Sequence, residues 1–280
     1  MTVASQIEEV EHALVPQLVS YCQNSFQGIY LPSHDQTHHQ RTWNYAKNLL
    51  LEFSGTLYIS PSLIENMALA ALLHDTGMVE TLDREHGMAG RRKALEFLKN
   101  NNLDPERFES GLHAIEYHDD KDYTSGHDDP GEKPSLLRLL SLADDLDALG
   151  YAGVFRYYEI YTLRGIILQQ LPTSVLDNLG NRFALMSEML DNHARFKNAM
   201  NKRYQITRNF FLQLNAELQN DTLPDQKIAA EVIRCFEEYF RKPRYTAEES
   251  RRWFPWGEVS SEIGKFFRSF YDEFLKLSVI

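Results

Sequence analysis

A histidine and an aspartate stand side by side at His74 and Asp75, at the end of an apolar run with helical spacing. The spacing of three and four residues places Asp75 on the buried face of the predicted helix. A buried carboxylate beside an imidazole is costly unless a partner compensates for it, and a divalent metal ion is the strongest such partner. His38 and Asp144 supply further ligand types on two other predicted helices. The residue types therefore predict a metal site made of His38, His74, Asp75 and Asp144.

The order of these residues resembles the signature of the HD-domain superfamily. Three stretches carry the resemblance: His38 with Arg41 three residues later, AALLHDTG at residues 70–77, and LADDLDAL at residues 142–149. It covers residues 30–150 and implies an all-α HD-domain helical bundle with metal-dependent phosphohydrolase activity. The choice of His38 over its neighbour His39 depends only on the spacing to Arg41, so His39 stays an alternative ligand.

Two further histidines extend the resemblance to HD enzymes that hold two metals, including bacterial hydrolases of dinucleoside polyphosphates. His86 opens a predicted helix in EHGMAG (residues 85–90), and His118 closes another in AIEYHD (residues 114–119). The resemblance implies that His86 and His118 join the four ligands and that Asp75 bridges two ions. Two alternatives stay open: both histidines are ordinary solvated helix-end residues, or His113 replaces His118.

Many such enzymes carry a lysine shortly after the His-Asp pair, whereas residues 76–79 (TGMV) contain none. Another cation must then neutralise a substrate phosphate. The candidates are Arg41, Lys121, Arg156 and Arg164. Lys121 lies in a stretch rich in Gly, Pro and Asp between residues 118 and 134, which is interpreted either as a lid over the site or as a solvated connector.

Composition favours a soluble cytoplasmic enzyme. The 280 residues are 43% hydrophobic, which is enough for a large core, and no stretch reaches the roughly 18 apolar residues of a membrane span. The N-terminus lacks the pattern of a signal peptide, and two cysteines, Cys22 and Cys235, provide no disulfide framework. A net charge of -11 disfavours general nucleic-acid binding. Histidine and carboxylate ligands suit one or two divalent ions of Mn, Fe, Co, Ni, Zn or Mg.

Helical periodicity extends through the whole chain, and no convincing strand appears. We expect an HD domain at residues 1–165 and a helical extension at 166–280, which packs on the first domain, shapes the cleft or forms a homodimer interface. The predicted helices are an opening helix at 8–22, the His38 helix with its apolar stripe at 43–53, a helix launched by Ser60 and Pro61, a helix from Pro105 to His118, and the Asp144 helix ended by Gly150.

The ligand chemistry indicates hydrolysis of a phosphate ester or anhydride by metal-activated water, because no nucleophile motif or Gly-rich phosphate loop is present. Asp75 is the expected bridging catalytic carboxylate, and Asp147, one turn beyond Asp144, is a candidate to orient the water or a ligand. Nucleotides, dinucleoside polyphosphates and cyclic dinucleotides all fit as the small phosphorylated substrate. Two rival hypotheses are a di-iron HD-like oxygenase and a non-catalytic sensor that binds a nucleotide or a protein partner.

Overall fold

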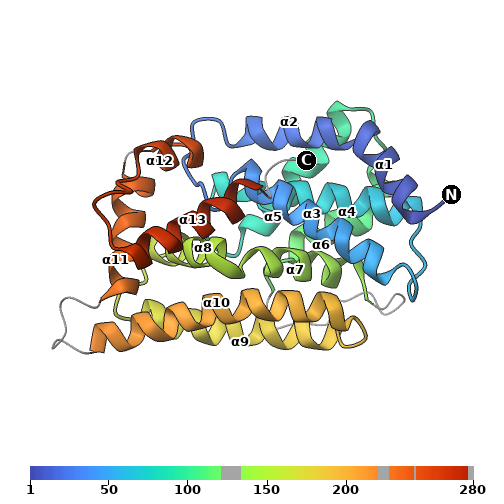
Figure 1. The fold of residues 1–280 in the computed structure, drawn as a ribbon. Coiled ribbons are helices and arrows are strands. Elements are labelled where there is room, and N and C mark those ends of the chain that lie inside the picture. The colour runs from blue at the N-terminus through green and yellow to red at the C-terminus, as the bar shows by residue number, and fades with distance from the viewer. Residues whose placement is uncertain (121–133, 220–226, 243, 277–280) are drawn as a thin grey trace. The chain divides into compact units, whose positions relative to one another are not determined.

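The computed structural model describes residues 1–120, 134–219, 227–242 and 244–276 (Figure 1). In these residues the chain forms thirteen α-helices, a few short 3-10 and π segments, and no β-strand. The predicted all-α fold is therefore confirmed. Internal contacts divide the chain into two compact units, residues 1–147 and residues 148–279. A compact unit is not by itself an independently folding domain, so the predicted domain boundary after residue 165 stays a prediction.

Within its described residues, 1–120 and 134–147, the first unit contains seven α-helices and two 3-10 helices. They are α1 (Val3–Ala13), α2 (Val15–Ser25), α3 (Gln36–Phe53), α4 (Pro61–Leu73), η1 (Thr76–Val79), α5 (His86–Asn100), η2 (Pro105–Phe108), α6 (Glu109–Tyr117) and α7 (Leu136–Asp147).

The prediction of one opening helix at residues 8–22 is wrong, because two helices cover this segment. α1 ends at Ala13, and α2 begins at Val15 with Pro16 in its first turn. Proline has no backbone N–H to donate, and its ring clashes with the carbonyl oxygen four residues earlier, so a helix cannot continue through it without strain. The break at Leu14 lets Ile7 and Leu18 both lie in the core.

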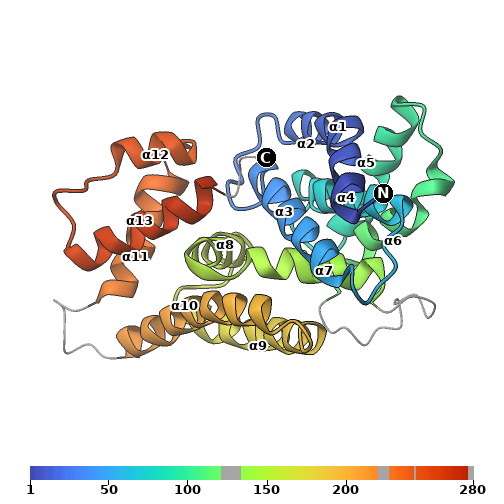
Figure 2. The ribbon, with the colours of Figure 1, turned by 45° about the vertical axis from the view of Figure 1, so that its right-hand side comes forward.

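The helix α4 lies in the interior of the first unit. The Ser60 hydroxyl accepts a hydrogen bond from the Leu63 N–H at 3.1 Å, and Pro61 occupies the first turn, as the sequence predicts for a helix start. Every residue from 66 to 73 is buried. α3, α6, α7 and both opening helices pack around α4, and the two ribbon views show α3 beside it (Figure 1 and Figure 2). This packing fixes the end of α4, where the His-Asp pair lies.

The helix that carries Asp144 ends earlier than expected. α7 stops at Asp147, and Gly150 has the predicted left-handed conformation (φ 79°) but begins the next helix instead of ending α7. Leu149 between them has an extended backbone (φ -106°, ψ 159°) and is the N-cap of that helix. The chain therefore leaves the helical conformation before it reaches Gly150.

The second unit is also helical. Its helices are α8 (Gly150–Leu163), α9 (Leu171–Met189), α10 (Ala194–Gln219), α11 (Ile228–Phe236), the π-helix η4 (Glu237–Arg241), α12 (Ala247–Trp253) and α13 (Ser261–Lys276). Phe155 on α8 lies within 5.8 Å, ring centroid to ring centroid, of phenylalanines on η4, α11 and α13. The aromatic stripes of the sequence thus form a hydrophobic core.

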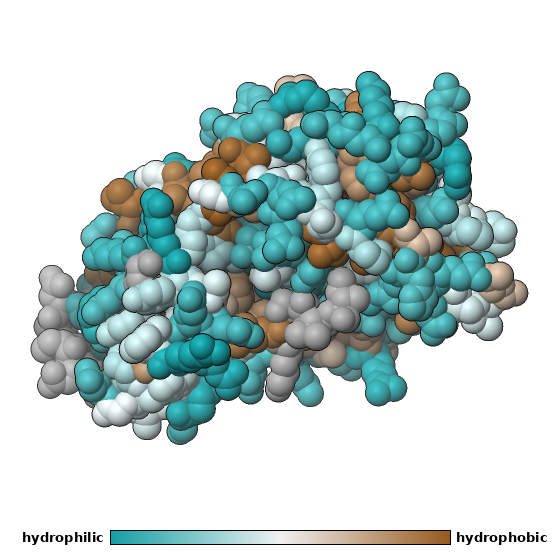
Figure 3. All heavy atoms as spheres, turned by 90° about the horizontal axis from the view of Figure 1, so that it is seen from above, coloured by the Kyte–Doolittle hydropathy of each residue, from teal (hydrophilic) through white to brown (hydrophobic). Residues whose placement is uncertain are grey.

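Hydrophilic residues cover most of the face drawn in Figure 3. Cys22 and Cys235 are both buried and free of disulfide bonds. Among the helices of the described residues, none combines the length and the apolar character that crossing a membrane requires.

Candidate metal centre

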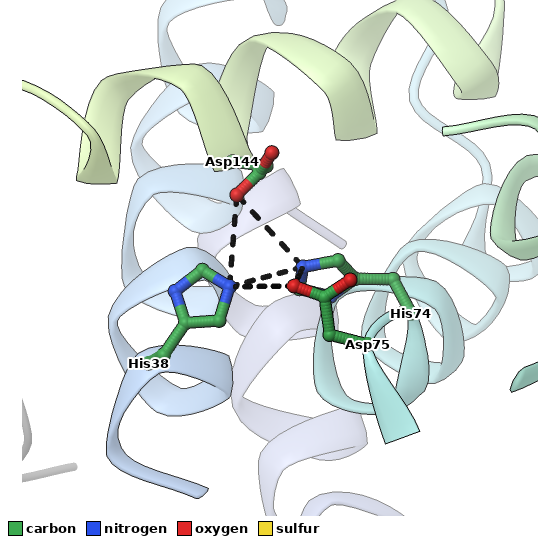
Figure 4. Close-up of side chains that lie close together, drawn as sticks. All are labelled: His38, His74, Asp75 and Asp144. Carbon is green, nitrogen blue, oxygen red and sulfur yellow. Dashed lines mark hydrogen bonds and ion pairs between the residues drawn. The ribbon is translucent and has the colours of Figure 1, made fainter. Parts of the chain in front are cut away.

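Four of the predicted ligands meet inside the first unit. His38 lies on α3, His74 is the C-cap of α4, Asp75 follows it, and Asp144 lies on α7. All four are at least 96% buried, and their side chains point toward one another (Figure 4). His38 Nε2 is 3.1 Å from His74 Nε2, 3.4 Å from Asp75 Oδ2 and 3.6 Å from Asp144 Oδ1. We call these four residues the first group.

A second group shares Asp75 and adds the two histidines that the extended resemblance implies. His86 is the first residue of α5, and His118 is the C-cap of α6. Asp75 Oδ1 lies 2.9 Å from His118 Nε2 and 3.3 Å from His86 Nε2, and the two imidazole nitrogens are 3.3 Å apart. His86 and His118 are both buried.

The two carboxylate oxygens of Asp75 face different groups. Oδ2 lies 3.4 Å from His38 Nε2 and 3.3 Å from His74 Nε2, whereas Oδ1 faces His86 and His118. One carboxylate that presents one oxygen to each of two ligand sets has the arrangement of a bridging ligand. The geometry therefore suits two neighbouring cations.

The hydrogen bond at Nδ1 of each histidine defines which ring nitrogen is available to a metal ion. In all four histidines Nδ1 lies within hydrogen-bond distance of a carbonyl or carboxylate oxygen, so Nδ1 donates and Nε2 is the nitrogen turned toward the group. The acceptors are Asp147 Oδ2 for His38 (2.8 Å), Ala71 O for His74 (3.1 Å), Asp83 O for His86 (2.6 Å) and Ile115 O for His118 (2.7 Å). Four Nε2 atoms and the carboxylate oxygens thus converge, and a cation is a partner that suits all of them.

The spacing of the ligand atoms fits a metal ion. With metal–ligand bonds of about 2.1 Å, tetrahedral or octahedral geometry separates adjacent ligand atoms by about 3.0–3.4 Å. The separations given above are 3.1–3.6 Å in the first group and 2.9–3.3 Å in the second. One pair, His74 Nε2 and Asp144 Oδ1, is slightly wider at 3.9 Å. Both sets can close on an ion with small movements of the side chains.

Three glycines allow the backbones around the second group to approach closely. A Cβ atom at Gly77 would lie 2.0 Å from His86 O, one at Gly87 would lie 2.3 Å from Glu116 O, and one at Gly90 would lie 2.7 Å from His74 O. No larger residue fits these positions without a shift of the backbone. The glycines therefore bring η1, α5 and α6 near enough for His86 and His118 to reach Asp75.

Burial and neighbouring charges set the protonation of the second group in the metal-free protein. Burial opposes charge on His86, but its hydrogen bond to Asp75 and the charge of that carboxylate raise the pKa of His86 to about 9. Burial lowers the pKa of His118. Burial also opposes charge on Asp75, yet the surrounding imidazoles, His74 foremost, hold the pKa of this carboxyl well below its usual range. A proton on His86 thus occupies the place that a cation would take.

The alternatives to His38 and His118 lie outside both groups. His39 is fully buried, packs against Phe26 and His74, and has a pKa lowered well below its usual value, chiefly by burial. His113 is half-buried and packs on the ring of Tyr117.

One histidine near the site was given no role by the sequence. His34 is buried, lies 2.6 Å from Ser33 Oγ through Nδ1, and contacts the edge of the His38 ring. Only its position four residues before His38 could have indicated this contact.

Arg41 and Asp147 form a buried ion pair with each other. Both are fully buried, and Arg41 donates from Nε and Nη2 to the two oxygens of Asp147 at 2.8 and 3.1 Å. Asp147 also accepts from His38 Nδ1, on the face of the ring opposite the ligand atom. The bond to His38 is compatible with the prediction that Asp147 orients a ligand. The buried pairing of Arg41 with Asp147 differs from the predicted contact of Arg41 with phosphate.

The other predicted cations lie elsewhere. Lys121 and most of the predicted lid, residues 121–133, lie outside the described residues. Arg156 is buried within α8 and Arg164 is exposed at its end, both in the second unit. Their placement near substrate stays a prediction.

Comparison with known families agrees with this geometry. The family model described as the HD domain matches residues 36–149, from the start of α3 to just beyond α7. All six residues of the two groups fall within this range. Residues 36–149 therefore form an HD domain. Comparisons with curated proteins and with solved structures found no match.

Proposed function

We propose that this chain is a metal-dependent phosphohydrolase that acts on a phosphate ester or anhydride, with a nucleotide or dinucleotide as substrate. The observation that carries the proposal is the convergence of four imidazole Nε2 atoms on the two oxygens of Asp75, with each Nδ1 bonded to an acceptor. Divalent ions bound by such ligands lower the pKa of water and offset the negative charge of a phosphoryl group.

In this proposal the residues of the two groups bind different ions. His38, His74 and Asp144 hold one ion, His86 and His118 hold the second, and Asp75 joins them. In the proposal the attacking group is water, because the imidazole and carboxylate side chains of both groups serve as ligands. Because the ligands are buried, little solvent screens the electrostatic interaction between them and a bound ion.

Cations must also meet the substrate, and residues 76–79 offer none. We propose that Lys121, Arg156 and Arg164 contribute to phosphate binding. Arg91 is a weaker candidate, because it pairs with Glu109 and Glu116.

A phosphate-release screen tests the activity. The Mn²⁺-loaded protein is incubated with mononucleotides, dinucleoside polyphosphates and cyclic dinucleotides, and Asp144→Ala serves as the control. We expect release or cleavage for at least one class, with loss of most of the rate in the variant. Activity that survives complete metal removal, or a covalent phosphoenzyme, would contradict the proposal. Oxygen uptake by the iron-loaded protein without any phosphate release would favour the oxygenase instead.

A further inference from the structure

Asp147 accepts three hydrogen bonds from two neighbouring side chains, His38 and Arg41. Its two oxygens receive His38 Nδ1–H at 2.8 Å and Arg41 Nε–H and Nη2–H at 2.8 and 3.1 Å. An ionised carboxylate has no proton of its own and can accept from all three donors at once. The fully buried Arg41 supplies the compensating charge, and its Nη1 donates to Thr37 Oγ1 at 3.1 Å. The carboxylate is therefore fixed in both charge and orientation.

This support distinguishes His38 from the other three histidines. His74, His86 and His118 each donate Nδ1–H to a backbone carbonyl, whereas His38 donates to a charged side chain. A carboxylate acceptor increases the electron density at the opposite nitrogen and makes it a stronger ligand than a carbonyl acceptor does. The first group also has four protein ligands against three in the second.

We infer that Asp147 and Arg41 form a positioning pair that acts through His38 to make the first group the tighter of two unequal metal positions. Arg41 holds the plane of the carboxylate and shares its charge through two hydrogen bonds. The inference depends on the proposed metal centre. It adds to the proposed function that neither Asp147 nor Arg41 contacts the substrate.

Stepwise binding of Mn²⁺ in competition with a chelator measures the two positions separately. For Asp147→Asn we expect the affinity of the tighter position to fall about 10–100-fold while the weaker position changes little, because an amide cannot accept from all three donors. Asp145→Asn is the matched control, since it removes the charge of a buried aspartate from the same helix. An equal loss in the control, or a loss confined to the weaker position, would overturn the inference.

The wild-type protein gives a second readout that a purely structural role would not move. In the Zn²⁺-loaded protein with ¹⁵N-labelled histidine, the Nδ1 proton of His38 should resonate further downfield than those of the three carbonyl-bonded histidines, because its acceptor is charged. Arg41→Lys should shift this resonance and weaken the tighter position less than Asp147→Asn does. Four similar resonances, or an Arg41→Lys protein unchanged in both readouts, would overturn the inference.

Two results distinguish failure of the proposed metal centre from failure of this inference alone. A wild-type protein that binds no metal refutes the metal centre itself. A wild-type protein that binds two ions of equal affinity leaves the metal centre standing and refutes the unequal positions.

Discussion

At Asp75, each carboxylate oxygen faces a different pair of imidazoles. The residue is 4% exposed, and its negative charge is the counterpart of the nearby histidines. Without cations, one proton on His86 partly compensates this charge. With cations, both oxygens would become direct ligands, and Asp75 would contribute to the binding of both ions.

The first prediction follows from this shared position. Asp75→Ala should lose both ions, whereas His118→Ala should lose one and keep the other, because the first group retains four ligands. Elemental analysis of protein prepared with excess Mn²⁺ and then dialysed measures the metal per chain. Equal metal content in the wild type and in His118→Ala would limit the centre to one ion.

The second prediction concerns pH. An ion in the second group needs His86 without its Nε2 proton, and Asp75 raises the pKa of that histidine from 6.5 to about 9 in the metal-free protein. Each ion bound near neutral pH must therefore displace a proton. The affinity of the second group for Mn²⁺ should rise about tenfold per pH unit up to pH 9 and level off above it. A binding constant that is flat between pH 7 and 9 would show that His86 is already neutral.

At the scale of elements, the ends of helices deliver the ligands. His74 caps α4, His86 begins α5 and His118 caps α6, so small shifts between these helices change the ligand distances directly. The contact between η1 and the start of α5 is the closest of them, because Gly77 has no Cβ atom.

The third prediction tests this contact. Gly77→Ala would place a Cβ atom 2.0 Å from His86 O, and α5 must move to accommodate it. We expect the free energy of unfolding to fall by about 1–3 kcal/mol, and the second group to lose its ion before the first. Urea unfolding and metal content measure the two effects.

Gly180→Ala on α9 is the control for this substitution. Nothing lies within 4 Å of a Cβ atom there, and alanine in a helix interior should stabilise the protein by about 0.5–1 kcal/mol. A Gly77→Ala protein as stable as the wild type, with its full metal content, would refute the close contact.

At the scale of the whole molecule, folding and metal binding are coupled. The ligands come from α3, α4, α5, α6 and α7, which the unfolded chain does not hold together. An ion that binds only the folded state stabilises it by about 2.7 kcal/mol when its concentration is 100 times the dissociation constant.

The fourth prediction is that removal of metal by EDTA lowers the melting temperature of the wild type. The Asp75→Ala protein should melt at the same temperature with and without EDTA, because it has no ion to lose. Differential scanning calorimetry compares the four samples. A wild-type melting temperature that EDTA leaves unchanged would mean that the ion contributes nothing to the stability of the fold.

The sequence alone predicted the helical class, the helix starts at Ser60 and His86, and the six residues that meet around Asp75. These features are local or ordered along the chain: apolar spacing identifies helices, and residue type limits which side chains can bind a cation. The break at Leu14 was also indicated locally by Pro16, but the apolar stripe on both sides of it suggested a single helix.

The tertiary structure decided which atoms meet. Sequence spacing cannot distinguish His38 from His39, since both are buried on α3, and only the packing of α3 against α4 and α7 turns His38 toward Asp75. The bond between His38 and Asp147 joins residues 109 positions apart, and Arg41 closes on the same carboxylate. The positions of such partners depend on how whole helices pack. For this reason the sequence could name Asp147 as a residue that orients water or a ligand, but not His38 as that ligand or Arg41 as the partner of the carboxylate.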